Sequence, residues 1–470
     1  MGLENFFKRD EKAVHHNPTR TIMLGFFIVI CIGALLLNLP FASQDGKSIG
    51  LLDAFFTATS AVCVTGLAVV NTLHHWTVFG KIVIIVLIQI GGLGFMTIVT
   101  LVLILARKKI TLKERILIQE SLNQNSMEGM VRLVVNIIKG TILLETIGAI
   151  LLAFCFIPTY GVGKGILYGI FHSISAFCNA GFDILGESSL VPYVGNLPVN
   201  LIIMSLIVMG GLGFTVWIDL LKSIHLKRGN QFDFRYSLRK LTLHSKIVLS
   251  MTIFLIFGGA LFFFICEYSN GETMGNLSFG SKIIASFMQS VTSRTAGFFS
   301  IDQSQMTYAS KLMTIILMFI GGSPAGTAGG IKTVTLSVLV IAVISVIKGS
   351  DTTHCYGKNI PFDILQKALA IFFISLSAVM GITMILAFTE KSSVFSHEFI
   401  DLLYETVSAL GTVGTSTGIT PYLSVPGRIV IGIAMFMGRI GPISIAMGLT
   451  RKKRKNKNLI NYPEERVLVG

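Results

Sequence analysis

The chain has 470 residues, of which 52% are hydrophobic and 13% are charged, and its mean hydropathy is +0.74. This composition excludes an ordinary soluble domain and indicates a protein that crosses a bilayer several times. The formal net charge of +14 does not indicate nucleic-acid binding, because the basic residues cluster between the apolar runs.

Apolar runs long enough to cross a hydrocarbon core of about 30 Å as helices recur along the chain. The first, at residues 21–37, is not followed by an A-x-A-like cleavage site, so we expect a retained span rather than a secretory signal. The other expected spans are 80–106, 137–157, 199–221, 247–266, 364–388 and 428–449. Basic clusters at 8–20, 107–115, 227–240 and 451–457 predict that these segments and both termini are cytoplasmic.

A short segment recurs four times between these runs, which indicates internal duplication. The copies are Ser60–Gly66, Ser175–Gly181, Val291–Gly297 and Ser408–Gly414. Their closing glycines are 115, 116 and 117 residues apart. Stretches of about 12 residues, too short to cross a membrane, lead into each copy at 51–60, 166–175, 282–290 and 399–408.

The repeating unit is therefore a helix, a re-entrant half-helix, an extended loop and a second helix. We predict an all-α polytopic membrane protein whose four tandem repeats surround one pseudo-fourfold pore, with eight spanning helices. The predicted repeats are 21–109, 132–222, 246–350 and 361–450. The predicted cytoplasmic segments are 1–20, 110–131, 223–245, 351–360 and 451–470.

Glycine loops at membrane depth leave carbonyl groups without helical partners, which is tolerable where those groups line a water-filled path. Four equivalent loops in one chain would encircle an ion and replace its hydration shell, and glycine leaves no side chain in the path. The predicted ion-selectivity residues are Val64, Thr65, Gly66, Asn179, Ala180, Gly181, Thr295, Ala296, Gly297, Thr412, Val413 and Gly414.

The four loops, together with Thr292–Phe298, the glycine-rich run at 321–330 and Phe436–Arg439, resemble the Trk/Ktr/HKT superfamily of K⁺ transporters. The resemblance covers nearly the whole chain and is greatest to bacterial KtrB-type membrane subunits, because only about 20 residues precede the first span. It implies K⁺ as the transported ion, a homodimer, and a cytoplasmic ring of nucleotide-binding, KtrA-like regulatory subunits. It implies no cofactor in this chain, and it leaves open whether Na⁺ couples to or activates transport.

The apolar run at 308–347 would be about 60 Å long as one helix, so we predict that it breaks. The break is expected as an unwound intramembrane loop that acts as a gate below the filter. The predicted gate residues are Gly321, Gly322, Ser323, Pro324, Ala325, Gly326, Thr327, Ala328, Gly329, Gly330, Lys332 and Arg439. For the related runs 91–94 and 210–213 we expect close helix packing instead.

Charged residues inside apolar segments are expensive and therefore candidates for function. Arg439 is expected to bind gate-loop carbonyls, whereas Arg294 and Glu405 are expected to pair as a scaffold behind the filter. Asp183 and Asp302 follow their glycines and would either attract cations to the outer mouth or have no measurable effect. The six cysteines form no C-x-x-C pair and are expected to be buried small hydrophobes.

Two other classes of protein fit the sequence less well. An enzyme is disfavoured, because the near-motifs at 414–418 and 326–333 lack the strand-to-helix setting that a nucleophile elbow or a P-loop needs. A transporter of organic solutes is disfavoured, because the loops present carbonyls rather than a mixed pocket. The basic cytoplasmic face, including 227–240, is expected to dock a regulatory subunit or anionic membrane lipid.

Overall fold

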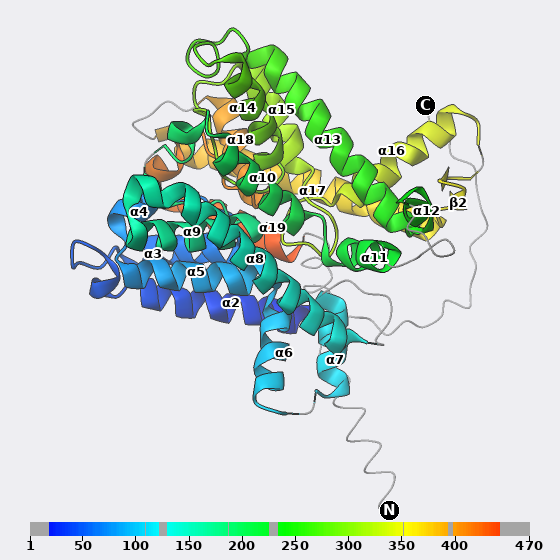
Figure 1. Cartoon of the computed structure of the whole chain (residues 1–470), viewed down its shortest axis with the longest axis horizontal. Helices are drawn as coiled ribbons and strands as arrows, with labels where there is room; N and C mark the ends of the chain where they lie inside the picture. Colours follow the sequence, from blue (N-terminus) through cyan, green and yellow to red (C-terminus); the bar gives the residue numbers. More distant parts are fainter. Residues whose placement is uncertain are drawn as a thin grey trace, which may run out of the picture.

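The computed structural model describes residues 18–108, 110–121, 129–186, 188–224, 234–350, 352–392 and 398–441. The described chain is mostly helical (Figure 1), which confirms the predicted all-α membrane fold class. Residues 1–17 and 442–470, which include the basic C-terminal segment, lie outside the described residues.

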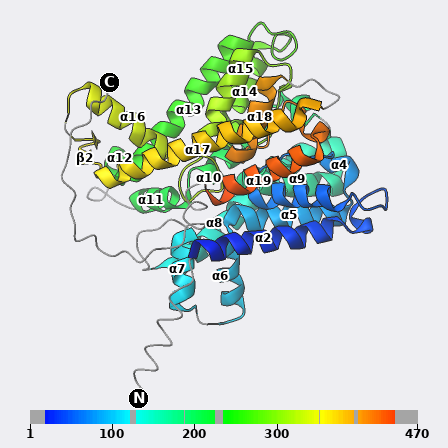
Figure 2. The same cartoon turned by 180° about the vertical axis from the view of Figure 1, so that it is seen from behind.

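Each quarter of the chain contributes an outer helix, a buried half-helix and an inner helix, in that order. The first two quarters are α2 (Pro18–Leu37), α3 (Leu51–Cys63) and α5 (Val78–Leu93), then α8 (Met130–Tyr160), α9 (Val162–Phe177) and α10 (Leu197–Gly211). The last two are α13 (Leu243–Glu267), α14 (Phe279–Thr292) and α15 (Tyr308–Phe319), then α17 (Phe362–Thr389), α18 (Phe399–Gly411) and α19 (Val425–Ile440). Figure 2 shows α2, α5, α19 and α17 packed in adjacent rows.

The four outer helices are each long and apolar enough to cross a membrane, and the count rises to six with two bent pairs. The bent pairs are α5 with α6 (Phe95–Leu105), at 98°, and α10 with α11 (Phe214–Ile224), at 96°. α15 and α19 have 12 and 16 residues. They occupy the inner-helix positions of the last two quarters. The four outer helices, the two bent pairs and these two shorter helices together correspond to the eight predicted spans.

The expectation of continuous spans at 80–106 and 199–221 was therefore wrong. The chain turns at Gly94 and Gly213, whose φ angles of +84° and +91° suit glycine. The expected close packing is also present, because a Cβ atom on Gly92 would lie 2.8 Å from the Cβ atom of Cys178. A Gly-Gly-Leu-Gly run thus allows both close packing against a neighbouring segment and a turn of the chain.

Shorter elements connect the spans and extend from the helix layer. α6 and α7 (Leu112–Ser121) project together beside the start of α8 (Figure 1). The others are η1 (Pro40–Ala42), α4 (Thr72–His75), η2 (Val191–Tyr193), α12 (Phe234–Lys240), α16 (Thr333–Ile347), β1 (His354–Cys355), β2 (Lys358–Asn359), η3 (Glu390–Ser392) and η4 (Thr420–Tyr422). β1 and β2 form an antiparallel hairpin.

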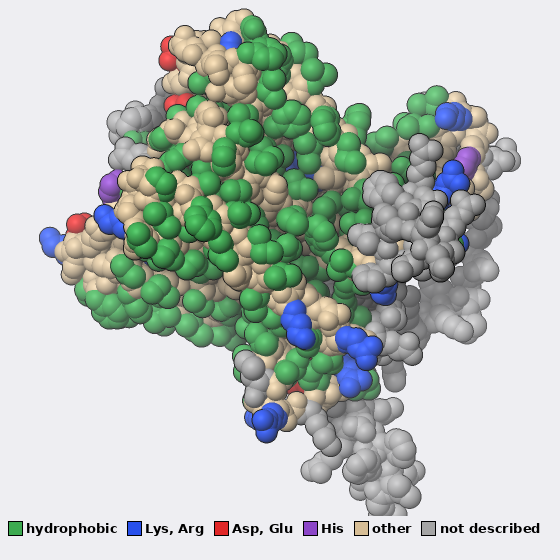
Figure 3. Space-filling view, in the orientation of Figure 1, with side chains coloured by type: hydrophobic (Ala, Val, Ile, Leu, Met, Phe, Trp, Pro, Cys, Tyr) green, Lys and Arg blue, Asp and Glu red, His purple; other side chains and the backbone are tan. Residues whose placement is uncertain are grey.

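The face of the molecule seen in Figure 3 carries many hydrophobic side chains, as a lipid-facing surface requires. Phe154, Phe254 and Phe388 are 71%, 67% and 81% exposed, values that water would not favour for such side chains. The half-helices, in contrast, are mostly buried at the centre. Of the six cysteines only Cys63 and Cys178 are buried, so the expectation of buried cysteines holds for those two alone.

Candidate ion pathway

The four closing glycines meet at the centre of the molecule and form a closed ring. A Cβ atom on Gly66 would lie 3.1 Å from the Cα atom of Gly181, and one on Gly181 would lie 2.7 Å from that of Gly297. The corresponding distances are 3.4 Å from Gly297 to Gly414 and 3.0 Å from Gly414 back to Gly66. All four have positive φ angles, between +69° and +98°. The ring therefore has no room for a side chain at any of its four positions.

Carbonyl groups converge on this ring. The residue before each closing glycine presents its carbonyl oxygen to the closing glycine of the neighbouring repeat; these residues are Thr65, Ala180, Ala296 and Val413. The residues one position earlier have left-handed φ angles of 58°, 60°, 74° and 52°; they are Val64, Asn179, Thr295 and Thr412. Such angles are strained for β-branched residues, and strain of this kind clusters at functional sites.

Each loop is fastened mainly to its own half-helix. The N–H groups of Gly66 and Gly414 donate to the hydroxyls of Ser60 and Ser408, at 3.0 and 3.1 Å. In the second repeat the Ser175 hydroxyl donates to the carbonyl oxygen of Phe182, at 2.6 Å. The third repeat has Val291 at this position, and the N–H of Ala296 donates instead to the carbonyl oxygen of Thr292 at 2.9 Å.

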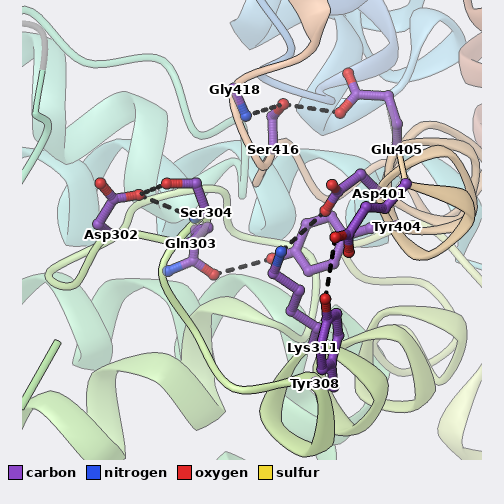
Figure 4. A network of polar contacts seen from close by, with 11 residues as sticks. Asp302, Gln303, Ser304, Tyr308, Lys311, Asp401, Tyr404, Glu405, Ser416 and Gly418 are labelled. Atoms are coloured by element: carbon purple, nitrogen blue, oxygen red, sulfur yellow. Dashed lines mark hydrogen bonds and ion pairs between the residues drawn. The ribbon is translucent and has the colours of Figure 1, made fainter. Parts of the chain in front are cut away.

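The half-helices direct their C-terminal ends, where the helix dipole is negative, toward the ring. Within the described parts of the chain, ion pairs hold their N-terminal ends at two of the four joints between repeats. Arg428 of α19 pairs with Asp53 of α3 at 2.6 Å, and Lys311 of α15 pairs with Asp401 of α18 at 3.0 Å (Figure 4). The two aspartates occupy equivalent positions, 13 residues before Gly66 and Gly414.

A network of neutral and acidic groups lies behind the third and fourth loops (Figure 4). Tyr404 donates to the side-chain oxygen of Gln303 at 2.9 Å, and Glu405 accepts hydrogen bonds from the hydroxyls of Ser416 and Thr420. The predicted pairing of Arg294 with Glu405 is wrong. Glu405 is satisfied by hydroxyls of its own repeat, so it does not need a cation.

Below the ring, α15 and α16 are separated by residues 320–332, as the glycine-rich run predicted. This loop is bonded to the bend between α10 and α11. Ser323 N–H donates to the carbonyl oxygen of Gly211 at 2.9 Å, and Phe214 N–H donates to that of Ala325 at 2.9 Å. The Thr327 hydroxyl donates to the carbonyl oxygen of Phe177, at the end of α9, at 3.1 Å.

Two basic side chains bind the same loop. The guanidinium of Arg439 donates to the carbonyl oxygen of Thr327, and its other nitrogen donates to those of Gly91 and Gly92. Lys332 donates from Nζ to the carbonyl oxygen of Ala328 at 2.6 Å. Arg439 thus joins the loop to the end of α5 in another repeat, a link that the sequence did not predict.

The two aspartates expected at the outer mouth have local partners. Asp183 accepts from the N–H of Leu185 at 3.3 Å, and the exposed Asp302 accepts from the N–H of Ser304 at 2.9 Å (Figure 4). Both contacts stabilise the turns that the aspartates begin.

Sequence reasoning missed the ion pairs and a buried acid, Glu145 of α8. A signal for the pairs existed, because Asp53 and Asp401 share one position in the repeat and Lys311 and Arg428 share another, 14 residues after the closing glycine. Glu145 had the signal of an acidic residue at the centre of an apolar run.

Comparison with known proteins places this architecture among ion transporters. A protein-family profile described as "TrkH: Cation transport protein" matches residues 5–458. The chain is 42% identical over 457 residues to the Potassium/sodium uptake protein NtpJ of Enterococcus hirae, covering 97% of each chain. It is 41% identical over 459 residues to the Ktr system potassium uptake protein B of Bacillus subtilis, covering 98% of each.

A solved structure has the same fold. The potassium transporter TrkH from Vibrio parahaemolyticus superposes with a TM-score of 0.73 at 17% identity, over 93% of this chain and 86% of that one. These relatives and this structural neighbour are ion transporters rather than enzymes.

Proposed function

Because this chain belongs to the TrkH family of cation transport proteins, and within it is similar to Ktr-type potassium uptake proteins, we propose that it takes up K⁺ across the plasma membrane through the ring of four glycine loops. The closed ring of Gly66, Gly181, Gly297 and Gly414, with a carbonyl group beside each glycine, is the observation that carries the proposal. Carbonyl oxygens in such a ring replace the hydration shell of a monovalent cation.

In this mechanism the helix dipoles and the membrane potential both favour entry of a cation. Four half-helix C-termini face the ring and favour a cation there. The membrane potential drives the ion inward, with about 2.3 kcal/mol per charge for each 100 mV. K⁺ is cargo, and the chain uses no resident cofactor in this proposal.

The loop at 321–330 acts as the gate, and Arg439 and Lys332 hold it closed. Their hydrogen bonds to the carbonyl oxygens of Thr327 and Ala328 fix the loop beneath the ring, and their charges repel an approaching cation. Movement of the bend between α10 and α11 would withdraw the loop, because Gly210 and Gly211 accept its hydrogen bonds.

The proposed assembly is a homodimer with both termini cytoplasmic, regulated by a ring of nucleotide-binding, KtrA-like subunits. The name of the Bacillus relative assigns that protein to a system, which supports a separate partner here. The basic segment 227–240 is proposed to dock that partner or anionic lipid. Neutralising its lysines and arginines should weaken co-purification with the partner, whereas unchanged association would leave orientation in the membrane as its role.

Sodium-dependent uptake is the second candidate, because the Enterococcus relative is named for potassium and sodium. The deciding experiment uses the full chain in vesicles with an imposed potential. Rb⁺ uptake that K⁺ inhibits, with a reversal potential that does not move when Na⁺ is varied, supports a K⁺ pore. A reversal potential that follows Na⁺ supports coupling, and flux of organic solutes alone would refute both.

A further inference from the structure

Glu145 of α8 is an acidic residue buried among apolar helices, and neither the proposed filter nor the proposed gate uses it. Its carboxylate accepts a hydrogen bond from the side-chain amide of Gln89 in α5, at 3.1 Å. It also accepts from the thiol of Cys178, which follows α9, at 3.8 Å. The same thiol lies 3.7 Å from the amide oxygen of Gln89. Three side chains from three elements therefore form one closed polar cluster.

The apolar surroundings of this cluster make it costly to bury the carboxylate of Glu145 there. On its outer side α8 and α9 form an open apolar groove of about 600 Å³, lined by residues such as Ile142, Ala149 and Ile170. Among the described residues that line the groove, Glu145 alone is ionisable. Glu145 is only 8% exposed, so its carboxylate depends on Gln89 and Cys178. An acidic group in such a place is normally retained for a function.

The cluster touches both irregular regions of the pathway. Cys178 immediately precedes Asn179, the left-handed residue of the second ring segment. Gly92 leaves the space that the Cys178 thiol occupies, since a Cβ atom there would lie 2.5 Å from the sulfur. The carbonyl oxygen of Gly92 also accepts from Arg439 at 3.2 Å. Glu145 therefore lies behind the second ring segment and behind the carbonyl groups that Arg439 binds.

We infer that Glu145 is a positioning residue, which fixes the second ring segment through Cys178 and the end of α5 through Gln89. The inference rests on the proposed role of the ring as an ion filter. Glu145 acts through its hydrogen bonds and not through its charge, because the carboxylate has two donors and faces no cation among its described contacts. A glutamine at this position keeps an acceptor for Gln89.

The test compares Glu145→Gln, Glu145→Leu and Gln89→Leu in the full chain, with K⁺ and Na⁺ uptake measured separately in vesicles. Glu145→Leu and Gln89→Leu should each raise the KM for K⁺ relative to that for Na⁺ by about fivefold, with a smaller change in kcat. Glu145→Gln should stay within about twofold of the parent. Thr146→Leu is the matched control, since Thr146 lines the same groove and its hydroxyl donates to the carbonyl oxygen of Ile142 in its own helix.

Gly181→Ser is measured in parallel to separate the two hypotheses. If Gly181→Ser changes the KM ratio while both leucine variants keep the parental ratio, the positioning role is refuted and the filter stands. If Gly181→Ser has no effect, the second ring segment does not select ions, and the positioning role, which acts on that segment, fails with it. A Glu145→Gln variant as impaired as Glu145→Leu would also refute the inference, because charge would then be the active property. If Glu145→Leu is not inserted, Gln89→Leu decides.

Discussion

The ring of four glycine loops and the loop at 321–330 are both irregular backbone at membrane depth, yet they are held in different ways. The ring segments bond to their own half-helices, for example Gly66 to Ser60. The loop at 321–330 has bonds within its own repeat, such as Lys332 to Ala328, but it also bonds to other repeats through Gly210, Gly211 and Arg439. Backbone that is satisfied locally keeps its shape when repeats shift, whereas backbone that is satisfied across repeats moves with them. This difference supports the proposal that the ring selects the ion and the loop acts as the gate.

The largest expected effect comes from breaking the fixed region. Gly414→Ser, or the same change at Gly66, Gly181 or Gly297, should reduce the preference for K⁺ over Na⁺ by about tenfold or more, because the new side chain displaces a neighbouring carbonyl. Relative uptake of the two ions in vesicles measures it. Gly418→Ser is the control, since Gly418 also has a positive φ, of +93°, but a Cβ atom placed on it would have no neighbour within 4 Å. Parental selectivity in all four ring variants would disprove the filter.

The next effect concerns the proposed gate loop at 321–330. Arg439→Gln should raise basal flux by roughly tenfold and reduce its dependence on a regulatory partner, because it removes a charge and its bonds to Thr327 and to α5. Shortening the loop at 321–330 should act in the same direction. Arg439→Lys keeps the charge but cannot bond to Thr327 and to the end of α5 at the same time. A flux between those of the parent and Arg439→Gln would therefore separate the effect of the charge from that of the hydrogen bonds. Parental flux in all these variants, at equal incorporation, would eliminate the gate.

The fixed region is tested again by its ion pairs. A double-mutant cycle of Lys311→Met and Asp401→Asn should give a coupling energy of about 1–2 kcal/mol in thermal unfolding, because the two side chains are only 8% and 16% exposed. The pair Lys367–Asp363, which is 72% and 65% exposed, should give a value near zero. Equal coupling energies in the two cycles would mean that burial does not strengthen the Lys311–Asp401 ion pair.

The smallest expected effect compares two hydroxyls of the gate loop, one bonded to another repeat and one bonded within the same repeat. Thr327→Val removes a hydroxyl that bonds to Phe177 in another repeat and should raise basal flux by about threefold. Ser323→Ala removes a hydroxyl that bonds to Thr333 in the same repeat and should leave flux unchanged. The opposite order of the two variants would contradict the proposed link between repeats.

The sequence predicted the ring because the repeats can be read directly from it: four similar segments at nearly equal spacing give four equivalent backbone positions. It did not predict the bends at Gly94 and Gly213, because a Gly-Gly-Leu-Gly run fits both a packed helix and a turn, and tertiary contacts decide between them. It wrongly paired Arg294 with Glu405, since opposite charge does not reveal that hydroxyls already satisfy the acid. The repeat boundaries, the dimer and the orientation stay predictions.

The contact between Arg428 and Asp53 joins residues 375 positions apart, and α19 also packs against α3. The last repeat to leave the ribosome therefore completes the first. Until residues 425–440 are inserted, Asp53 has no basic partner at that joint and the ring has one open side. A chain that stops after three repeats would therefore lack one side of the ring and the basic partner that Asp53 has in α19, so the pathway is complete only when the fourth repeat packs against the first.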